Sequence, residues 1–175
     1  MRNNPPSSPA AAPASAPAAP DRPGGGLSSA DQVVELADQL SSCADQLHER
    51  IVKEIRSHQG GSVPEKVQQA MRELLEDEIL LRQRANGLYA DAATVIVKGL
   101  GKPQSHLLAL TADAAEKIRK IGLIGEVTTL VAGLLAFAGA VTTGQPAPIL
   151  LALEKIHKQI KLIEAQAPKP PAGPA

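Results

Sequence analysis

Few side chains in this sequence are spaced so that they could carry chemistry. The single cysteine, Cys43, leaves no partner for an internal disulfide and no second thiolate for a zinc site. The four histidines, at positions 48, 58, 106 and 157, are too scattered to indicate a set of metal ligands. No histidine or basic residue lies near Cys43 in sequence to activate it, so we interpret it as a small core residue.

Two short motifs resemble functional sites, but each lacks an essential feature. The run Glu76-Asp77-Glu78 would lie on a helix, where sequence neighbours do not share a face, so it indicates solvated acidic surface rather than a metal site. Gly101-Lys102 fails as a phosphate loop, because Ile96 replaces the required first glycine and Pro103 replaces the required Ser or Thr. We therefore expect no catalytic residue, no cofactor and no metal, and infer that the protein is not an enzyme.

The N-terminal segment contains one potential ligand motif. Pro17 and Pro20, followed by Arg22, have the spacing of a polyproline II ligand of the SH3 type, in which the arginine meets an acidic rim. In a segment this rich in proline, the same spacing also arises by chance. The motif is one hypothesis for a partner site, and plain proline-rich composition is the alternative.

Both ends of the chain are predicted to be disordered. Residues 1–28 are rich in proline and alanine and contain no larger aliphatic side chain before Leu27, and residues 167–175 have a similar composition. No apolar stretch follows Arg2, so a secretory signal is not indicated, and a lone cysteine suits a reducing, intracellular and cytoplasmic location. With only Tyr89 and Phe137 as aromatic rings and 18 basic against 18 acidic residues, we expect no nucleic-acid partner.

The elements that would position any site are helices, beginning with a hairpin over 29–100. Ser29 followed by Gln32 predicts a capping box, and Gly60-Gly61 ends the first helix. Its apolar stripe includes Val33, Leu40, Leu47 and Ile51. A second capping box at Ser62–Glu65 predicts a helix that runs to about Gly99.

The second helix has the most regular pattern in the chain, an apolar residue at every seventh position. The repeat is typical of a coiled-coil seam and has one mismatch, Glu78. Its members are Val67, Leu74, Leu81, Leu88 and Val95. Two long helices joined by a short glycine-rich loop predict an antiparallel, coiled-coil-like hairpin. We call this seam and the stripe on the first helix the interaction seam.

Residues 104–166 are predicted to form a third helix, from Ser105, and a short amphipathic C-terminal helix. The second half of the third helix is almost free of charge and includes Ala132, Ala136 and Ala140 at intervals of four. Two alternatives fit this segment. Residues 121–147 are long enough to span a bilayer, or the helix is buried in the core of a bundle.

The sequence therefore predicts an all-α protein without catalytic function. The leading hypothesis is a coiled-coil adaptor or assembly subunit that binds a protein partner, or a second copy of itself, through the interaction seam. The alternative hypothesis is a membrane-anchored or membrane-inserting protein that uses residues 121–147. A membrane is thus the alternative partner, and membrane association the alternative location.

Overall fold

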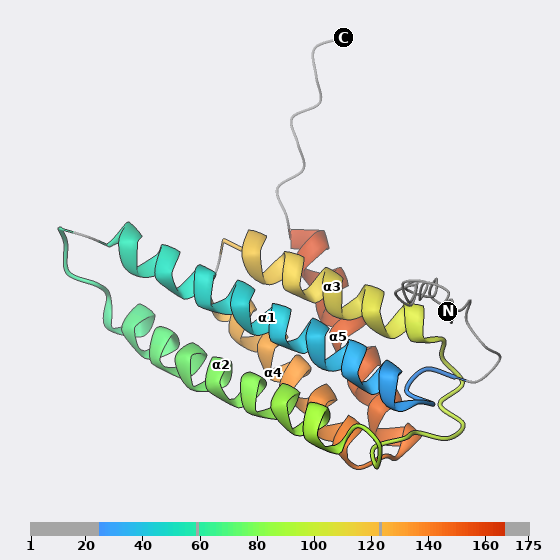
Figure 1. Cartoon of the computed structure of the whole chain (residues 1–175). Coiled ribbons are helices and arrows are strands. Elements are labelled where there is room, and N and C mark those ends of the chain that lie inside the picture. Colours follow the sequence, from blue (N-terminus) through green and yellow to red (C-terminus); the bar gives the residue numbers. More distant parts are fainter. Residues whose placement is uncertain (1–24, 59, 123, 167–175) are drawn as a thin grey trace, which may run out of the picture.

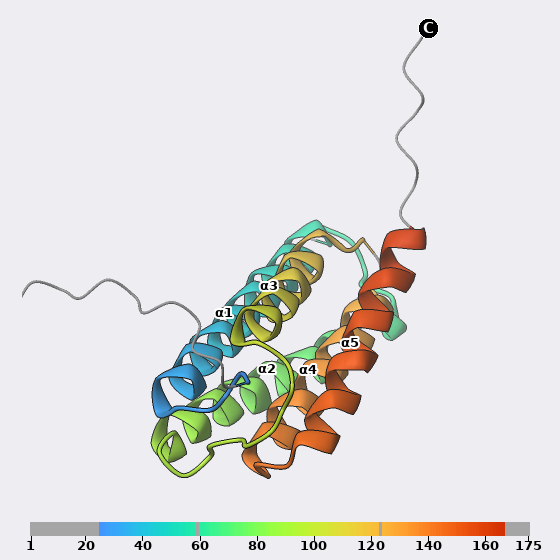
Figure 2. The same cartoon turned by 90° about the vertical axis from the view of Figure 1, so that its right-hand side faces the viewer.

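The computed structural model describes residues 25–58, 60–122 and 124–166, and the regular secondary structure within them is entirely α-helical. The five helices are α1 (Ala30–Ser57), α2 (Glu65–Asp91), α3 (Gln104–Lys120), α4 (Ile124–Thr142) and α5 (Pro146–Gln166). Each helix packs against two neighbours in the order α1, α2, α4, α5, α3 and back to α1, and α3 also contacts α4 (Figures 1 and 2). The helices thus surround one apolar core. The two terminal segments, 1–24 and 167–175, and with them Pro17, Pro20 and Arg22, lie outside the described residues.

The predicted start of α1 and its pairing with α2 are present. The Ser29 hydroxyl accepts a hydrogen bond from the Gln32 backbone amide at 3.3 Å, which satisfies one free amide of the first turn. The helices α1 and α2 are antiparallel, because Asp45 pairs with Arg82 whereas the earlier Asp38 accepts a hydrogen bond from the later Tyr89. Each of the two helices contributes one apolar face to the core.

The predicted boundaries of α2 are wrong at both ends. Its N-cap residue is Pro64, so no side-chain capping bond forms and the capping box expected from Ser62 is absent. The helix ends at Asp91 rather than near Gly99, and the Asp91 carbonyl accepts hydrogen bonds from the backbone amides of Thr94 and Val95 and from the Thr94 hydroxyl. A run of β-branched residues follows, whose helix propensity is low. Val97 instead donates its backbone amide to the Leu27 carbonyl at 2.9 Å.

The long third helix predicted from Ser105 is also wrong, since α3 and α4 are separate helices. The chain leaves the helical conformation at Ile121, with ψ of 130°. Buried Arg50 of α1 stabilises this break: its guanidinium donates to the carbonyls of Ile121 at 3.3 Å and Gly122 at 3.2 Å. An ion pair of 2.7 Å with Glu54 fixes the guanidinium in place. The amphipathic and the apolar parts of the predicted helix therefore form two helices, α3, which packs mainly on α1, and α4, which packs mainly on α5 and α2.

The final two helices complete the core. The chain turns at Gly144, which has a φ of 66°, and α5 begins at Pro146, so the turn predicted from Gly144-Gln145-Pro146 is present. The α5 helix has 21 residues against 19 in α4, and the prediction of a short C-terminal helix is therefore wrong. The inner face of α4 is fully buried at positions such as Leu134 and Phe137.

The N-terminal tail predicted over 1–28 ends earlier than expected, because Leu27 closes one end of the bundle. Its side chain is completely buried although its φ of 61° is unusual for a residue other than glycine. Its backbone amide donates to the side-chain oxygen of buried Gln104 at 3.0 Å. The Gln104 amide group in turn donates to the Gln32 carbonyl at 2.8 Å, which ties this segment to α1 and α3.

Candidate interaction surface

The residues of the predicted interaction seam lie almost entirely inside the bundle. The fully or nearly fully buried members are Val33, Leu40, Leu47, Ile51, Leu74, Leu81, Leu88 and Val95, and Val67 is half-buried. Val95 lies beyond the end of α2 and still reaches the core. Because α2 packs on α1 and α4, its apolar seam contacts other helices of the same chain. The surface of the folded bundle is therefore formed by other residues.

Glu78, the mismatch in the seam, lies in a small polar cluster between α1 and α2. Only 8% of the residue is exposed, and its carboxylate contacts His48 of α1 at 3.1 Å and Arg82 at 3.1 Å. Arg82 also pairs with Asp45 of α1 at 2.8 Å, and the two carboxylates raise the pKa of this guanidinium. The cluster satisfies a buried carboxylate and holds α1 against α2.

Cys43 is a core residue, as the sequence indicated. Its side chain is buried and its sulfur lies 3.4 Å from the Thr111 carbonyl of α3. Burial raises the pKa of the thiol to about 12, because the thiolate would be poorly solvated there. At neutral pH the group is a protonated thiol with no access to solvent, and it is chemically inert.

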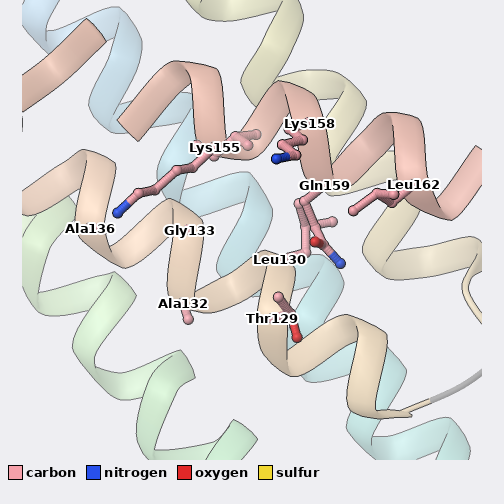
Figure 3. Close-up of a pocket in the computed structure, with 10 residues that line it drawn as sticks. Thr129, Leu130, Ala132, Gly133, Ala136, Lys155, Lys158, Gln159 and Leu162 are labelled. Atoms are coloured by element: carbon pink, nitrogen blue, oxygen red, sulfur yellow. The ribbon is translucent and has the colours of Figure 1, made fainter. Parts of the chain in front are cut away.

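A shallow apolar groove runs along the outer side of the bundle between α4 and α5 (Figure 3). Two adjoining hollows of about 440 and 390 Å³ share Ala136 and Lys155 and so form one continuous groove. The floor consists of small residues of α4, namely Thr129, Ala132, Gly133, Ala136, Gly139 and Ala140. At Gly133 a Cβ atom would lie only 3.2 Å from the Ile156 side chain, so this glycine allows α4 and α5 to pack closely.

Large side chains of α5 form one wall of the groove. Leu151 is 60% exposed and Leu162 is 46% exposed. Lys155 and Lys158 lie between them, and Figure 3 shows the Lys155 side chain extending toward Ala136. Neither lysine forms an ion pair with any residue in the described part of the chain. The groove therefore combines an uncharged floor with two unneutralised positive charges.

The outer face of α2 has the opposite character. Leu75 is 41% exposed, Ile79 is 58% exposed and Leu80 is 45% exposed, whereas Leu74, Leu81 and Leu88 of the same helix are buried. Three carboxylates of α2, Glu73, Glu76 and Asp77, pair with no cation among the described residues. At about 100° per residue, Glu73 and Asp77 lie on the opposite flank of the helix from Leu75. Partial burial and the neighbouring carboxylates raise the pKa of Asp77, which indicates a locally negative potential.

Only part of these surfaces could be predicted from the sequence. The spacing of Ala132, Ala136 and Ala140 was visible, and it indicated that another helix could approach closely. That Lys155 and Lys158 border this row depends on the fold of α5 over α4. Arg50 gave no sequence signal, because its carbonyl partners lie more than 70 residues away.

The fold and these surfaces define the protein as an all-α bundle with a groove on its outer side. No group of three or more His, Cys, Asp or Glu side chains that could hold a metal ion is found within residues 25–58, 60–122 and 124–166. Comparison with protein-family models, curated proteins and solved structures finds no significant match to this chain. Its function must therefore be argued from its own surfaces.

Proposed function

We propose that this protein is a non-catalytic adaptor or assembly subunit whose α4–α5 groove binds a helix of a protein partner. One observation carries the proposal: an apolar groove floored by alanine, glycine and threonine is bordered by two lysines without ion-pair partners. Small floor residues allow the backbone of a second helix to approach closely. The lysines would pair with carboxylates on that helix and orient it.

The proposal moves the binding surface away from the interaction seam predicted from the sequence. Leu74, Leu81 and Leu88 are completely buried between helices of one chain, so they cannot contact a partner while the bundle is closed. We infer that the seven-residue repeat serves coiled-coil-like packing of α2 within the bundle. Partner binding is then left to residues on the outside.

Two of the side chains with catalytic potential, Cys43 and Glu78, are buried, which supports a non-catalytic role. Cys43 is a buried thiol with a pKa of about 12. The Glu78 carboxylate is bound by His48 and Arg82 rather than directed at a cleft. Catalysis needs a reactive group within reach of a bound substrate, and these groups have no such access.

Site-specific photo-crosslinking tests the proposed groove. A photoreactive amino acid replaces Ala136 in the full chain, which is expressed in its source cells, irradiated and analysed by mass spectrometry. Ala109, exposed on α3 outside the groove, is the matched control position. We expect an adduct at position 136, but not at 109, with a peptide that carries apolar residues and carboxylates at helical spacing. The absence of any position-specific protein adduct would reject the proposal.

A membrane-inserting role is the second candidate, and one observation favours it. The α4 helix is long and apolar enough to cross a bilayer, and 44% of its most apolar 18-residue window is buried. Against this role, Lys155 lies over α4 in the groove, where a bilayer would have to accommodate its charge. Lipid adducts at position 136, together with flotation of the protein on liposomes, would favour the membrane over the protein partner.

A further inference from the structure

The connection between α3 and α4 differs from the other three connections of the bundle, because no local signal ends α3. Each of the other three contains glycine with a positive φ and has a proline at or just before the start of the next helix. These residues are Gly60, Gly99, Gly101 and Gly144, and Pro64, Pro103 and Pro146. The described residues of the α3–α4 break, Ile121 and Gly122, include no proline, and neither has a positive φ. The break therefore depends on contacts from elsewhere in the chain.

Arg50 of α1 supplies the contact that replaces a local signal. Its guanidinium donates to the carbonyls of Ile121 at 3.3 Å and Gly122 at 3.2 Å. In an uninterrupted α-helix, the same two carbonyls would accept from the amides four residues later, those of Gly125 and Glu126. Buried Arg50 thus takes the place of two helical donors. The two carbonyls are satisfied either by Arg50 in the bent form or by a helix that runs straight from α3 into α4.

A straight α3–α4 helix would separate α4 and α5 from the rest of their own chain. In the structure the chain reverses direction after α3, so that α4 packs on α2 and α5 packs on α3 (Figure 1). Straightening points α4 away from α2 and exposes core residues on both sides, such as Leu74 of α2 and Leu134 of α4. The unit that fits the vacated core of α1, α2 and α3 is α4–α5 of another copy, because its side chains are identical to those that left.

We propose that the α3–α4 break is a hinge, and that in its straight form two copies of this chain exchange their α4–α5 units. Helices α1, α2 and α3 of one copy then pack with α4 and α5 of the other, through the same core contacts as in the monomer. Because α4 and α5 contact each other and move together, each α4–α5 groove stays intact and the dimer presents two grooves. Exchange makes the adaptor bivalent. This consequence rests on the proposed function, whereas the exchange itself does not.

Alanine at Gly122 tests the hinge without changing the core. A Cβ atom at this position meets no atom within 4 Å, so alanine fits the bent form, and it favours the straight helix over glycine. Each dimer contains two straightened breaks, so Gly122→Ala should dimerise at least about fivefold more tightly than the wild type. Light scattering on the full chain, equilibrated over a concentration series, measures this. Gly87→Ala, inside α2 and equally free of neighbours, is the matched control for helix propensity and should dimerise like the wild type.

Proline at Gly122 should have the opposite effect. Ile121 already has the extended conformation that a residue before proline prefers, with φ of −62° and ψ of 130°, whereas proline would interrupt the straight helix. We expect Gly122→Pro to stay monomeric at concentrations at which the wild type dimerises, and dimerisation like that of the wild type would contradict the hinge. If circular dichroism shows that this variant does not fold, Arg50→Met replaces it. Loss of the Arg50 donors should raise the dimer fraction above that of the wild type.

Crosslinking distinguishes exchange from side-by-side association. Lys117 of α3 and Glu164 of α5 form an ion pair of 3.0 Å, which a carbodiimide converts into an amide bond. The dimer is prepared from an equal mixture of isotope-labelled and unlabelled monomer, and Glu164→Gln identifies the crosslinked peptide by its loss. Exchange predicts that half of the Lys117–Glu164 crosslinks join a labelled to an unlabelled chain.

Two results would overturn the proposal: Lys117–Glu164 crosslinks in the dimer that stay within single chains, or Gly122→Ala that dimerises no more than Gly87→Ala. Neither result affects the photo-crosslinking at position 136. That experiment decides separately whether the groove binds a partner helix.

Discussion

Helices α1 and α4 bury similar inner faces but differ in what they show to solvent. The inner face of α1 includes Leu40 and Leu47, and that of α4 includes Leu134 and Phe137, all completely buried. The outer face of α1 carries charged residues such as Glu49 and Lys53. The outer face of α4 carries only small uncharged residues, including Ala132 and Ala136. Core packing therefore does not explain the uncharged outer face of α4, whereas a bound partner would.

The largest expected effect tests whether the two inner faces are equally packed. Leu40→Ala in α1 and Leu134→Ala in α4 should each lower the free energy of unfolding by about 2–5 kcal/mol, because each leaves a cavity in the core. Urea denaturation of the full chain in aqueous buffer measures both. Ala136→Ser on the outer face of α4 should change stability by less than about 0.5 kcal/mol. A negligible effect of Leu134→Ala would mean that α4 is not packed in the core in solution.

The second-largest expected effect is on the break between α3 and α4, which Arg50 of α1 stabilises through hydrogen bonds. Arg50→Met removes the donors to the Ile121 and Gly122 carbonyls and leaves polar groups without partners. We expect a loss of about 2–3 kcal/mol in the free energy of unfolding, measured by urea denaturation, with faster amide exchange around residues 121–124. Lys53→Met, at an exposed site on the same helix, is the matched control. Equal effects of the two substitutions would show that the Arg50 contacts do not stabilise the break between α3 and α4.

The break between α3 and α4 shows how far the sequence could predict the fold. The stripe on α1, the N-cap at Ser29 and the turn at Gly144 depend on residues close in sequence, and all three predictions are confirmed. The break at Ile121 was missed, because helical patterning continues across it and the side chain that stabilises it is Arg50 of α1. Local patterns specify helices well, whereas tertiary hydrogen bonds decide where some of them end.

The candidate groove was predictable only in parts for a similar reason. The alanines at 132, 136 and 140 and the lysines at 155 and 158 were visible as separate patterns. Their meeting requires α5 to fold back along α4 after the turn at Gly144. A heptad pattern alone does not distinguish packing within a chain from packing between chains, so the sequence also predicts partner binding through the interaction seam. In the structure, α1 and α4 of the same chain pack on α2 and bury its seam.

The smallest expected effect is on the pH dependence of the free energy of unfolding, to which the inner face of α1 should contribute and that of α4 should not. Cys43 of α1 is buried with a pKa raised from 9.0 to about 12, whereas the buried positions of α4 contain no titratable group. Above about pH 9 the unfolded chain releases the thiol proton and the folded chain retains it, so stability should fall by up to about 1.4 kcal/mol per pH unit until about pH 12.

Urea denaturation at pH 8 to 10 measures the slope for the wild type and for Cys43→Ala. All other residues are the same in both proteins, so their contribution cancels in the difference between the two slopes. Identical slopes would contradict a desolvated thiol at the contact between α1 and α3.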